Sequence, residues 1–169
     1  MKKLNYLLLP FSFLFLCGFT FDIPECDHDE DEYNLEKCES MAESGDPKAM
    51  FYMGYLYDEG EDVAQDFKLA AMWYEESAEK GYSLAQFNLG FLYSVGDGVE
   101  QNDEKAFEWY LKAAEQGDID GQFNIGKSYQ NGYGVDKDLK KAAEWFKLAA
   151  DQGDEEAQIL YEELSKEIE

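Results

Sequence analysis

The sequence predicts an all-α fold, a right-handed helical-repeat solenoid of antiparallel helix pairs. The first observation behind this prediction is an internal repeat, because residues of the same type return every 36 positions. The second is that each unit contains two segments of helical apolar spacing, separated by a glycine-rich turn. The repeated positions include Gly45, Gly81, Gly117 and Gly153; Gly54, Gly90 and Gly126; Tyr57, Tyr93 and Tyr129; and Trp73, Trp109 and Trp145.

The first segment of each unit is predicted to be a helix with an unusually close neighbour. Asp46 and Pro47 are suited to a helix start, because Asp accepts from an unpaired N–H and Pro fits the first helical position. In the middle unit the expected inward residues are Ala85, Leu89, Leu92 and Tyr93. A glycine inside a helix costs about 1 kcal/mol relative to Ala. Because each unit has one, at 54, 90 and 126, we expect a contact there that leaves no room for a side chain.

A glycine-rich turn and a second helix complete the unit. The turn of the middle unit is Gly96-Asp97-Gly98-Val99, with the valine directed back into the core. The second helix is expected to begin after Asp66, Asn102 or Asp138, and to end at a left-handed glycine. In the middle unit its inward residues, at helical spacing, are expected to be Ala106, Trp109, Tyr110, Ala113 and Ala114.

These residues carry a family resemblance. The middle unit contains Ala85-Gln86-Phe87-Asn88-Leu89-Gly90, then Gly96, Gly98 and Val99, then Lys105-Ala106, Trp109-Tyr110, Ala113-Ala114 and Gly117. This pattern closely resembles the Sel1-like repeat, a relative of the tetratricopeptide repeat. The resemblance covers three full units from Gly45 to Gly153 and extends as half-units on both sides. The sequence departs from the pattern at Asp62, Gly121 and Ser77.

The repeat divides the chain into segments with different expected roles. The C-terminal helix is expected to turn Ala157, Leu160 and Leu164 inward and its glutamates outward, closing the solenoid core. The expected segments are a signal peptide, 1–20; an acidic N-terminal segment, 21–34; an N-terminal half-repeat, 35–45; three Sel1-like repeats, 46–81, 82–117 and 118–153; and a C-terminal capping helix, 154–169.

The N-terminal segment predicts export to the periplasm or beyond. Lys2 and Lys3 form a positive start, and the apolar run 4–16 is too short for a typical membrane span. Small residues favour cleavage after Thr20. Two alternatives remain, a retained anchor and a lipoprotein modified at Cys17. Cleavage would remove Lys2 and Lys3 and so change the net charge from −24 to −26.

Export would also place the remaining cysteines where a disulfide can form. Cys17 would leave with the signal peptide, and Cys26 and Cys38 would remain in an oxidising compartment. We therefore expect a Cys26–Cys38 disulfide, worth about 3 kcal/mol in the chain-entropy model.

The charge balance restricts the class of partner. The chain has 38 Asp and Glu residues against 14 basic residues, and every basic residue is a lysine. A nucleic-acid interface needs clustered cations and the arginine fork, and an anionic membrane surface repels such a chain. We expect a monomer that binds another protein or peptide, with basic partners favoured by long-range attraction.

Catalytic and metal sites are weakly indicated. Ser77 and Lys80 fit a Ser-x-x-Lys pattern, which keeps a β-lactamase-like or penicillin-binding hydrolase as an alternative. The repeat explains both residues, because Ala113 and Gln116 hold the same positions in the next unit. His28 is the single histidine and lies in an acidic run, 27–32, without the turn glycine of a calcium loop. We expect no enzyme activity, no cofactor and no metal.

The resemblance implies a binding surface. In tetratricopeptide-like arrays the first helices line a concave face, and residues off the core stripe point into it. Phe51, Phe87 and Phe123 recur so regularly that a packing role is equally open for them. An inhibitor or immunity protein for a basic partner is a further alternative. The expected partner-binding residues are Lys48, Tyr52, Tyr55, Leu84, Asn88, Phe91, Asp120, Asn124 and Lys127.

Overall fold

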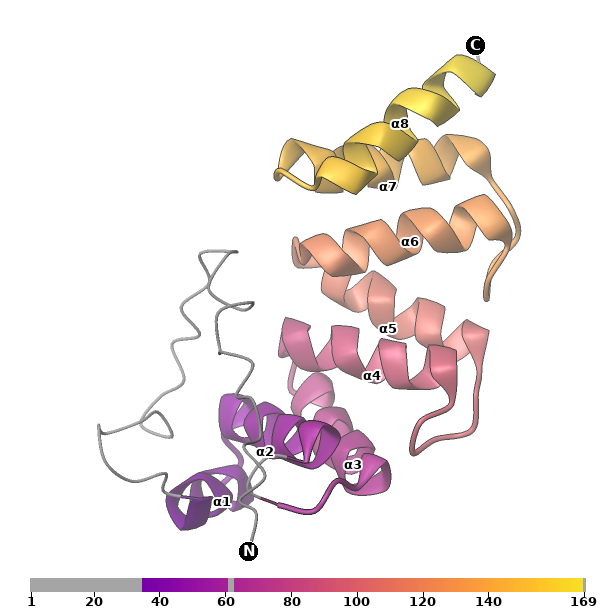
Figure 1. Cartoon of the computed structure of the whole chain (residues 1–169). Helices are drawn as coiled ribbons and strands as arrows, with labels where there is room; N and C mark the ends of the chain where they lie inside the picture. Colours follow the sequence, from indigo (N-terminus) through magenta and orange to yellow (C-terminus); the bar gives the residue numbers. More distant parts are fainter. Residues whose placement is uncertain (1–34, 61–62, 169) are drawn as a thin grey trace, which may run out of the picture.

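A computed structural model describes residues 35–60 and 63–168, and in this part of the chain turns and loops join α-helices, without a strand (Figure 1). Consecutive helices pack against each other along the whole series. The predicted all-α solenoid is therefore confirmed. The helices are α1 (Leu35–Glu43), α2 (Pro47–Glu59), α3 (Phe67–Glu79), α4 (Ser83–Val95), α5 (Asp103–Glu115), α6 (Ile119–Asn131), α7 (Leu139–Asp151) and α8 (Glu155–Ile168).

The helix pairs are α2 with α3, α4 with α5 and α6 with α7, and α1 and α8 lie at the two ends of the stack. In Figure 1, α4, α6 and α8 lie toward the viewer, and α5 and α7 lie behind them. The first helices of successive units therefore share one side of the solenoid. We call the surface formed by α2, α4 and α6 the first-helix face.

The starts of α2 to α8 follow the expected capping chemistry with one exception. The Asp46 carboxylate accepts from the backbone N–H groups of Lys48 and Ala49, and Asp66, Asn102 and Asp138 cap the second helices in the same way. Before α4 the cap position is Tyr82, whose side chain makes no capping hydrogen bond. Its ring lies 5.3 Å from the ring of Phe51, so packing against the preceding unit replaces the cap here.

The helix-interior glycines meet aromatic rings of the paired helix. A Cβ atom on Gly54 would lie 2.6 Å from the Tyr74 ring, and one on Gly90 would lie 2.8 Å from the Tyr110 ring. Gly126 faces Phe146 in the same manner, at 2.6 Å. The predicted close contact is thus present in each unit, and it sets the distance between the two helices of the pair.

One expected core residue is placed differently. Ala106, Tyr110, Ala113 and Ala114 are buried as predicted, but Trp109 is only half-buried. The Lys112 ammonium makes a cation–π contact with its indole ring, with Nζ 3.5 Å from the ring centroid. Trp109 is not fully buried because the next residue, Tyr110, occupies the space beside Gly90. The indole therefore lies at the edge of the helix pair.

Buried glutamines connect successive units. Gln86 of α4 donates to the Ala78 carbonyl of α3 at 3.0 Å and accepts at 2.7 Å from the side chain of Gln116, which directly follows α5. One repeat later, Gln122 donates to a carbonyl of α5 and accepts at 2.9 Å from the side chain of Gln152, which directly follows α7. The side chains of Gln86 and Gln122 are buried, and these bonds give their amide groups the partners that water cannot supply there. The bonds therefore hold neighbouring units in a single register.

The C-terminal helix closes the core as expected. Ala157 and Leu164 of α8 are buried against α7, and Leu160 is half-buried beside them. Glu155, Glu156 and Glu162 are exposed on the outer side. The polar outer surface of α8 replaces the next unit that the stack would otherwise need.

We predict that Gly90→Ala destabilises the protein, although alanine favours helix formation over glycine by about 1 kcal/mol. The new Cβ would lie 2.8 Å from the Tyr110 ring, and overpacking of this kind costs about 1 to 3 kcal/mol. Thermal unfolding measured by circular dichroism should give a lower midpoint.

A Tyr110→Ala background is the control for this test, because it removes the ring that the Cβ would meet. In that background Gly90→Ala should raise the midpoint. Equal effects of Gly90→Ala with and without the ring would show that the glycine is not there to make room for it.

Candidate functional site

The nine predicted partner-binding residues lie at matching positions on the three first helices. All nine side chains are exposed or half-buried. Within each helix the spacing is i, i+4 and i+7, which places the three side chains on one side of the helix. The residues are Lys48, Tyr52 and Tyr55 on α2; Leu84, Asn88 and Phe91 on α4; and Asp120, Asn124 and Lys127 on α6.

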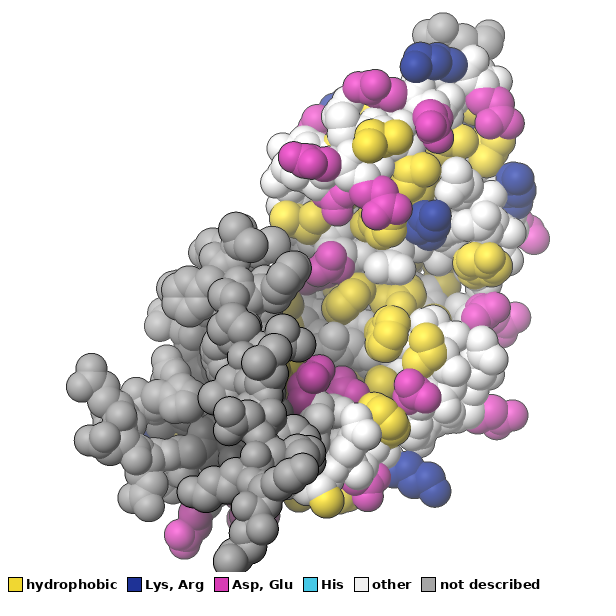
Figure 2. Space-filling view, viewed as in Figure 1, with side chains coloured by type: hydrophobic (Ala, Val, Ile, Leu, Met, Phe, Trp, Pro, Cys, Tyr) yellow, Lys and Arg dark blue, Asp and Glu magenta, His cyan; other side chains and the backbone are white. Residues whose placement is uncertain are grey.

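The helix α4 contributes an uncharged surface to a highly charged protein. The segment Ser83–Val95 contains no Asp, Glu or Lys, whereas 31% of the chain is charged. The Phe91 side chain is 48% exposed and Val95 is 44% exposed. Figure 2 shows hydrophobic side chains gathered over the region of α4 and α6, with acidic side chains around them. Val95 was not among the predicted site residues, although its spacing of four from Phe91 could have identified it.

A groove of about 490 Å³ lies beside this surface, where α5 meets α6. The predicted residues Asn124 and Lys127 both line it. Its other walls come from residues that sequence reasoning did not select, because they lie on different elements that only the packing of two units brings together. The residues that line the groove include Ser94, Asp103, Tyr110, Asn124, Lys127 and Ser128.

The hydrogen bonds in the groove leave several groups available to a ligand. The Ser94 hydroxyl donates to the Phe91 carbonyl at 2.7 Å, and the Tyr110 hydroxyl lies 3.4 Å from the Ser94 oxygen. The Asn124 side-chain nitrogen donates to the Asp120 carbonyl within its own helix, so its side-chain oxygen is the part left for an acceptor role. The Lys127 ammonium lies 5.9 Å from the Phe123 ring centroid.

The recurring phenylalanines of the first helices pack within the stack. Each ring contacts the aromatic residue that faces the glycine of its own unit. The centroid distances are 5.7 Å for Phe51 and Tyr74, 5.6 Å for Phe87 and Tyr110, and 5.6 Å for Phe123 and Phe146. Of the two roles that the sequence left open, the structure supports packing.

Carboxylates with raised pKa values lie at the end of α2 and at the start of α6. Desolvation raises the pKa of Asp58 at the end of α2, and the negative charge of Asp97 adds to this. At the start of α6, desolvation raises the pKa of Asp118 and of Asp120, and the nearby charge of Asp154 raises the latter further. The uncharged middle of the first-helix face therefore has acidic borders.

Comparison with known proteins explains the repeat. The family model of the Sel1 repeat matches residues 47–82, 83–118 and 119–154, which together make up more than half of the chain. The protein belongs to the Sel1 repeat family. Each matched unit begins at the first residue of a first helix, one residue after the start that the sequence predicted. Among curated proteins, none matches this chain.

Solved structures of several other proteins resemble this one. A Sel1 repeat protein from Oxalobacter formigenes is 36% identical, with a TM-score of 0.72 over 77% of this chain and 98% of that one. A protective antigen of uropathogenic Escherichia coli strains is 40% identical, with a TM-score of 0.72 over 75% of this chain and 27% of that one. The cysteine rich protein B of Helicobacter pylori, at 24% identity and a TM-score of 0.59 over 74% of this chain and 92% of that one, shows the shared fold.

The Ser-x-x-Lys pattern of this Sel1 repeat protein has a structural explanation. Ser77 is fully buried, and its hydroxyl donates to the Pro47 carbonyl at 2.6 Å, which joins α3 to α2. Lys80 is exposed at the end of α3. A buried hydroxyl that already donates to a carbonyl is poorly placed to attack a substrate. The hydrolase alternative gains no support from this pair.

Several predicted features lie outside the described residues. These are the signal peptide, the acidic run with His28, and the cysteines Cys17 and Cys26. Cys38 lies in the buried cluster that joins α1 to α2, and its pairing with Cys26 stays a prediction. In residues 35–60 and 63–168, no helix has the length and apolar content of a membrane span. The same residues contain no group of three potential ligands that could hold a metal ion.

The Sel1 repeat protein should become more stable as the pH falls from 7 toward about 4. A carboxyl group whose pKa is higher in the folded chain than in the unfolded chain takes up protons more readily when folded. Stability therefore rises as the pH falls through the folded pKa values of Asp58, Asp118 and Asp120, and levels off below the unfolded value of about 3.9. Thermal midpoints across this pH range measure the effect.

The variant Asp58→Asn should raise the midpoint at pH 7 and weaken its pH dependence, because the amide oxygen can still accept from the Tyr74 hydroxyl. Asp136→Asn, at an exposed position between α6 and α7, serves as the comparison. A midpoint that falls steadily with acidification would contradict the assignment of raised pKa values to these groups.

Proposed function

We propose that this Sel1 repeat protein is an exported scaffold that binds another protein or a peptide through the first-helix face, mainly over α4 and α6. The observation that carries the proposal is the uncharged helix α4, which exposes Phe91 and Val95 in a chain of net charge −24. Family membership supports the same role, because helical repeats of this kind offer extended surfaces for other proteins.

Apolar contact is expected to supply most of the affinity. An exposed aromatic side chain next to a second apolar residue is a typical anchor, and such anchors dominate most interfaces. The half-buried Leu84 and Asn88 lie on the same side of α4 and extend this surface toward the start of the helix. Lys48, Tyr52 and Tyr55 of α2 extend it into the first unit, where the two tyrosine rings are stacked 6.2 Å apart.

The charge of the protein favours the approach of a basic partner. Acidic side chains border the uncharged middle of the first-helix face, so basic residues on both sides of an apolar anchor would meet opposite charges. This distribution also suits the narrower role of an inhibitor or immunity protein for a basic partner. Steering of this kind weakens as salt shortens the Debye length, which is about 8 Å at physiological ionic strength.

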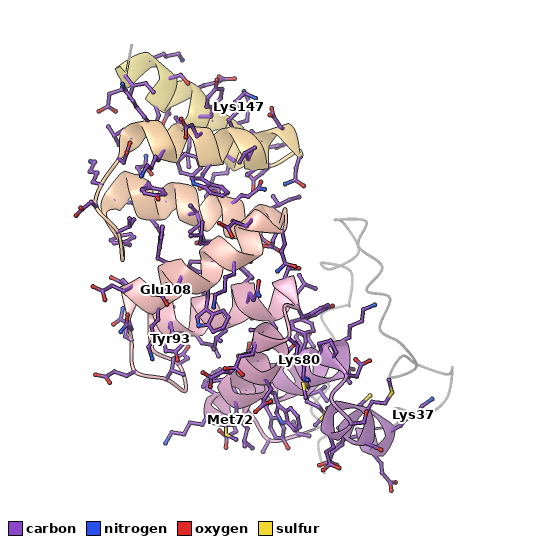
Figure 3. The ribbon with its side chains drawn as sticks, turned by 180° about the vertical axis from the view of Figure 1, so that it is seen from behind. Lys37, Met72, Lys80, Tyr93, Glu108 and Lys147 are labelled. Atoms are coloured by element: carbon purple, nitrogen blue, oxygen red, sulfur yellow. The ribbon has the colours of Figure 1, made fainter. Side chains whose placement is uncertain are left out.

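Phe91→Ala is expected to abolish or strongly weaken capture of the partner from an envelope extract. The matched control is Met72→Ala, because Met72 is also a large exposed apolar residue, at 60% exposure, but lies on α3 on the opposite side (Figure 3). Immobilised wild-type and variant proteins are compared by quantitative mass spectrometry of the captured proteins.

Association and dissociation rates measured with the captured partner distinguish the contribution of direct contacts from that of electrostatic steering. Phe91→Ala should raise the dissociation rate, whereas Glu108→Gln and Glu115→Gln on α5 should mainly lower the association rate at low salt. A partner that is retained by Phe91→Ala and lost by Met72→Ala would place the binding surface on the second helices.

Export makes a separate prediction that mass spectrometry can check. When the full-length sequence is expressed in a bacterium with a periplasm, the purified protein should begin at Phe21. Its non-reduced digest should contain Cys26 linked to Cys38. An intact N-terminus together with two alkylatable thiols would contradict both parts of this prediction.

A further inference from the structure

One core position of the third unit differs from its equivalents in a way that the fold alone does not explain. Leu56, Leu92 and Leu164 occupy equivalent positions of the 36-residue repeat, and all three are buried leucines. In α6 the same position holds Ser128, which is also buried, with only 6% of its surface exposed. The serine replaces a large apolar side chain with a small polar one, and the groove of about 490 Å³ lies at this place.

The Ser128 hydroxyl has no hydrogen-bond partner among the described residues, although its backbone carbonyl accepts from Gly132 and Tyr133. A buried hydroxyl without a partner is unfavourable, and a native structure rarely keeps one without a reason. Because Ser128 lines the groove, a molecule that enters the groove can supply the missing partner.

The residues around Ser128 are more polar than those of the preceding unit. One repeat earlier, the positions of Asp103, Lys127 and Ser128 hold Phe67, Phe91 and Leu92. The groove at α6 is therefore a polar counterpart of the apolar surface at α4. A peptide that lies across both helices would place one apolar side chain beside Phe91 and a later, polar side chain above Ser128.

We propose that the groove at Ser128 is a subsite for a neutral amide side chain, Asn or Gln, of an extended peptide segment of the partner. The proposal rests on the peptide-binding function proposed above and specifies what the partner must contain. The segment has an apolar residue that contacts Phe91 and Val95, and an amide residue that enters the groove between α5 and α6.

The chemistry of the groove selects an amide over the alternatives. Ser128 and Lys127 donate hydrogen bonds, and the Asp103 carboxylate and the Asn124 side-chain oxygen accept them. A primary amide both donates and accepts. A carboxylate would meet Asp103 and the net charge of −24, and a cation would meet Lys127, so the charges on the two sides of the groove favour a neutral group.

Ser128→Leu tests the proposal through two opposite effects. Leucine is the residue that the other units carry here, so it should fill the groove and raise the thermal midpoint by about 4 °C or more. The same change should remove the subsite. Ser128→Ala keeps the groove open and removes only the hydroxyl, and should weaken binding without the increase in stability.

The binding probe is a displayed library of random peptides selected on the wild-type protein. We expect the selected peptides to share an apolar residue and, at a fixed distance from it, an Asn or Gln. For synthetic versions, Ser128→Leu should raise Kd at least about tenfold, as should replacement of the amide residue by Leu or Glu, since a buried polar group rejects ligands that leave it unpaired.

The outcomes distinguish this inference from the function on which it rests. Peptides that lose affinity with Phe91→Ala but bind Ser128→Leu normally overturn the amide subsite and leave the peptide-binding surface in place. Peptides that bind both variants normally, or a library without any binder, overturn the subsite and count against the first-helix face as well. A thermal midpoint that falls in Ser128→Leu also overturns the subsite, because it would show that the position has no room for leucine.

Discussion

The contact between a first-helix glycine and an aromatic ring of the second helix is the constraint on which the rest of the stack depends. Because Gly54, Gly90 and Gly126 have no side chain, the ring of the paired helix lies directly on the helix backbone. This contact sets the spacing of each pair. It also sets the position of the neighbouring phenylalanine ring, which packs on the same aromatic residue in all three units.

Contacts between units turn three similar pairs into one ordered surface. The turn glycines Gly98 and Gly134 each lie against the start of the preceding second helix, where a Cβ would come within 2.0 Å of a backbone carbonyl oxygen. The bonds from Gln86 and Gln122 to carbonyls of the preceding second helix connect the opposite end of each unit to the next. Because both ends of each unit are held against the neighbouring unit, equivalent positions of α4 and α6 form continuous rows along the first-helix face. A ligand can therefore contact two units at once.

Variation between units is concentrated where the repeat does not need a particular residue. The row that contains Tyr55, Phe91 and Lys127 differs in every unit and is accessible to a partner. The adjacent row is a core row, and its leucine is replaced only in the third unit, by Ser128. A change that removes buried apolar surface from a core costs stability. Ser128 lies next to the most polar part of the first-helix face, which supports the proposed role of this position in binding.

The sequence by itself determined the helix pairs, their polar caps except at α4, and the close contact at the interior glycines. These features depend on residues that are close together in the chain or on the 36-residue period of the repeat, and both are visible in the sequence alone. Only the tertiary structure decided that Tyr110 rather than Trp109 fills the space beside Gly90, and that the Ser77 hydroxyl joins two helices. The groove around Ser128 was likewise decided there. Its walls come from α4, α5 and α6, and the repeat pattern records which residues are equivalent but not which residues of different units touch.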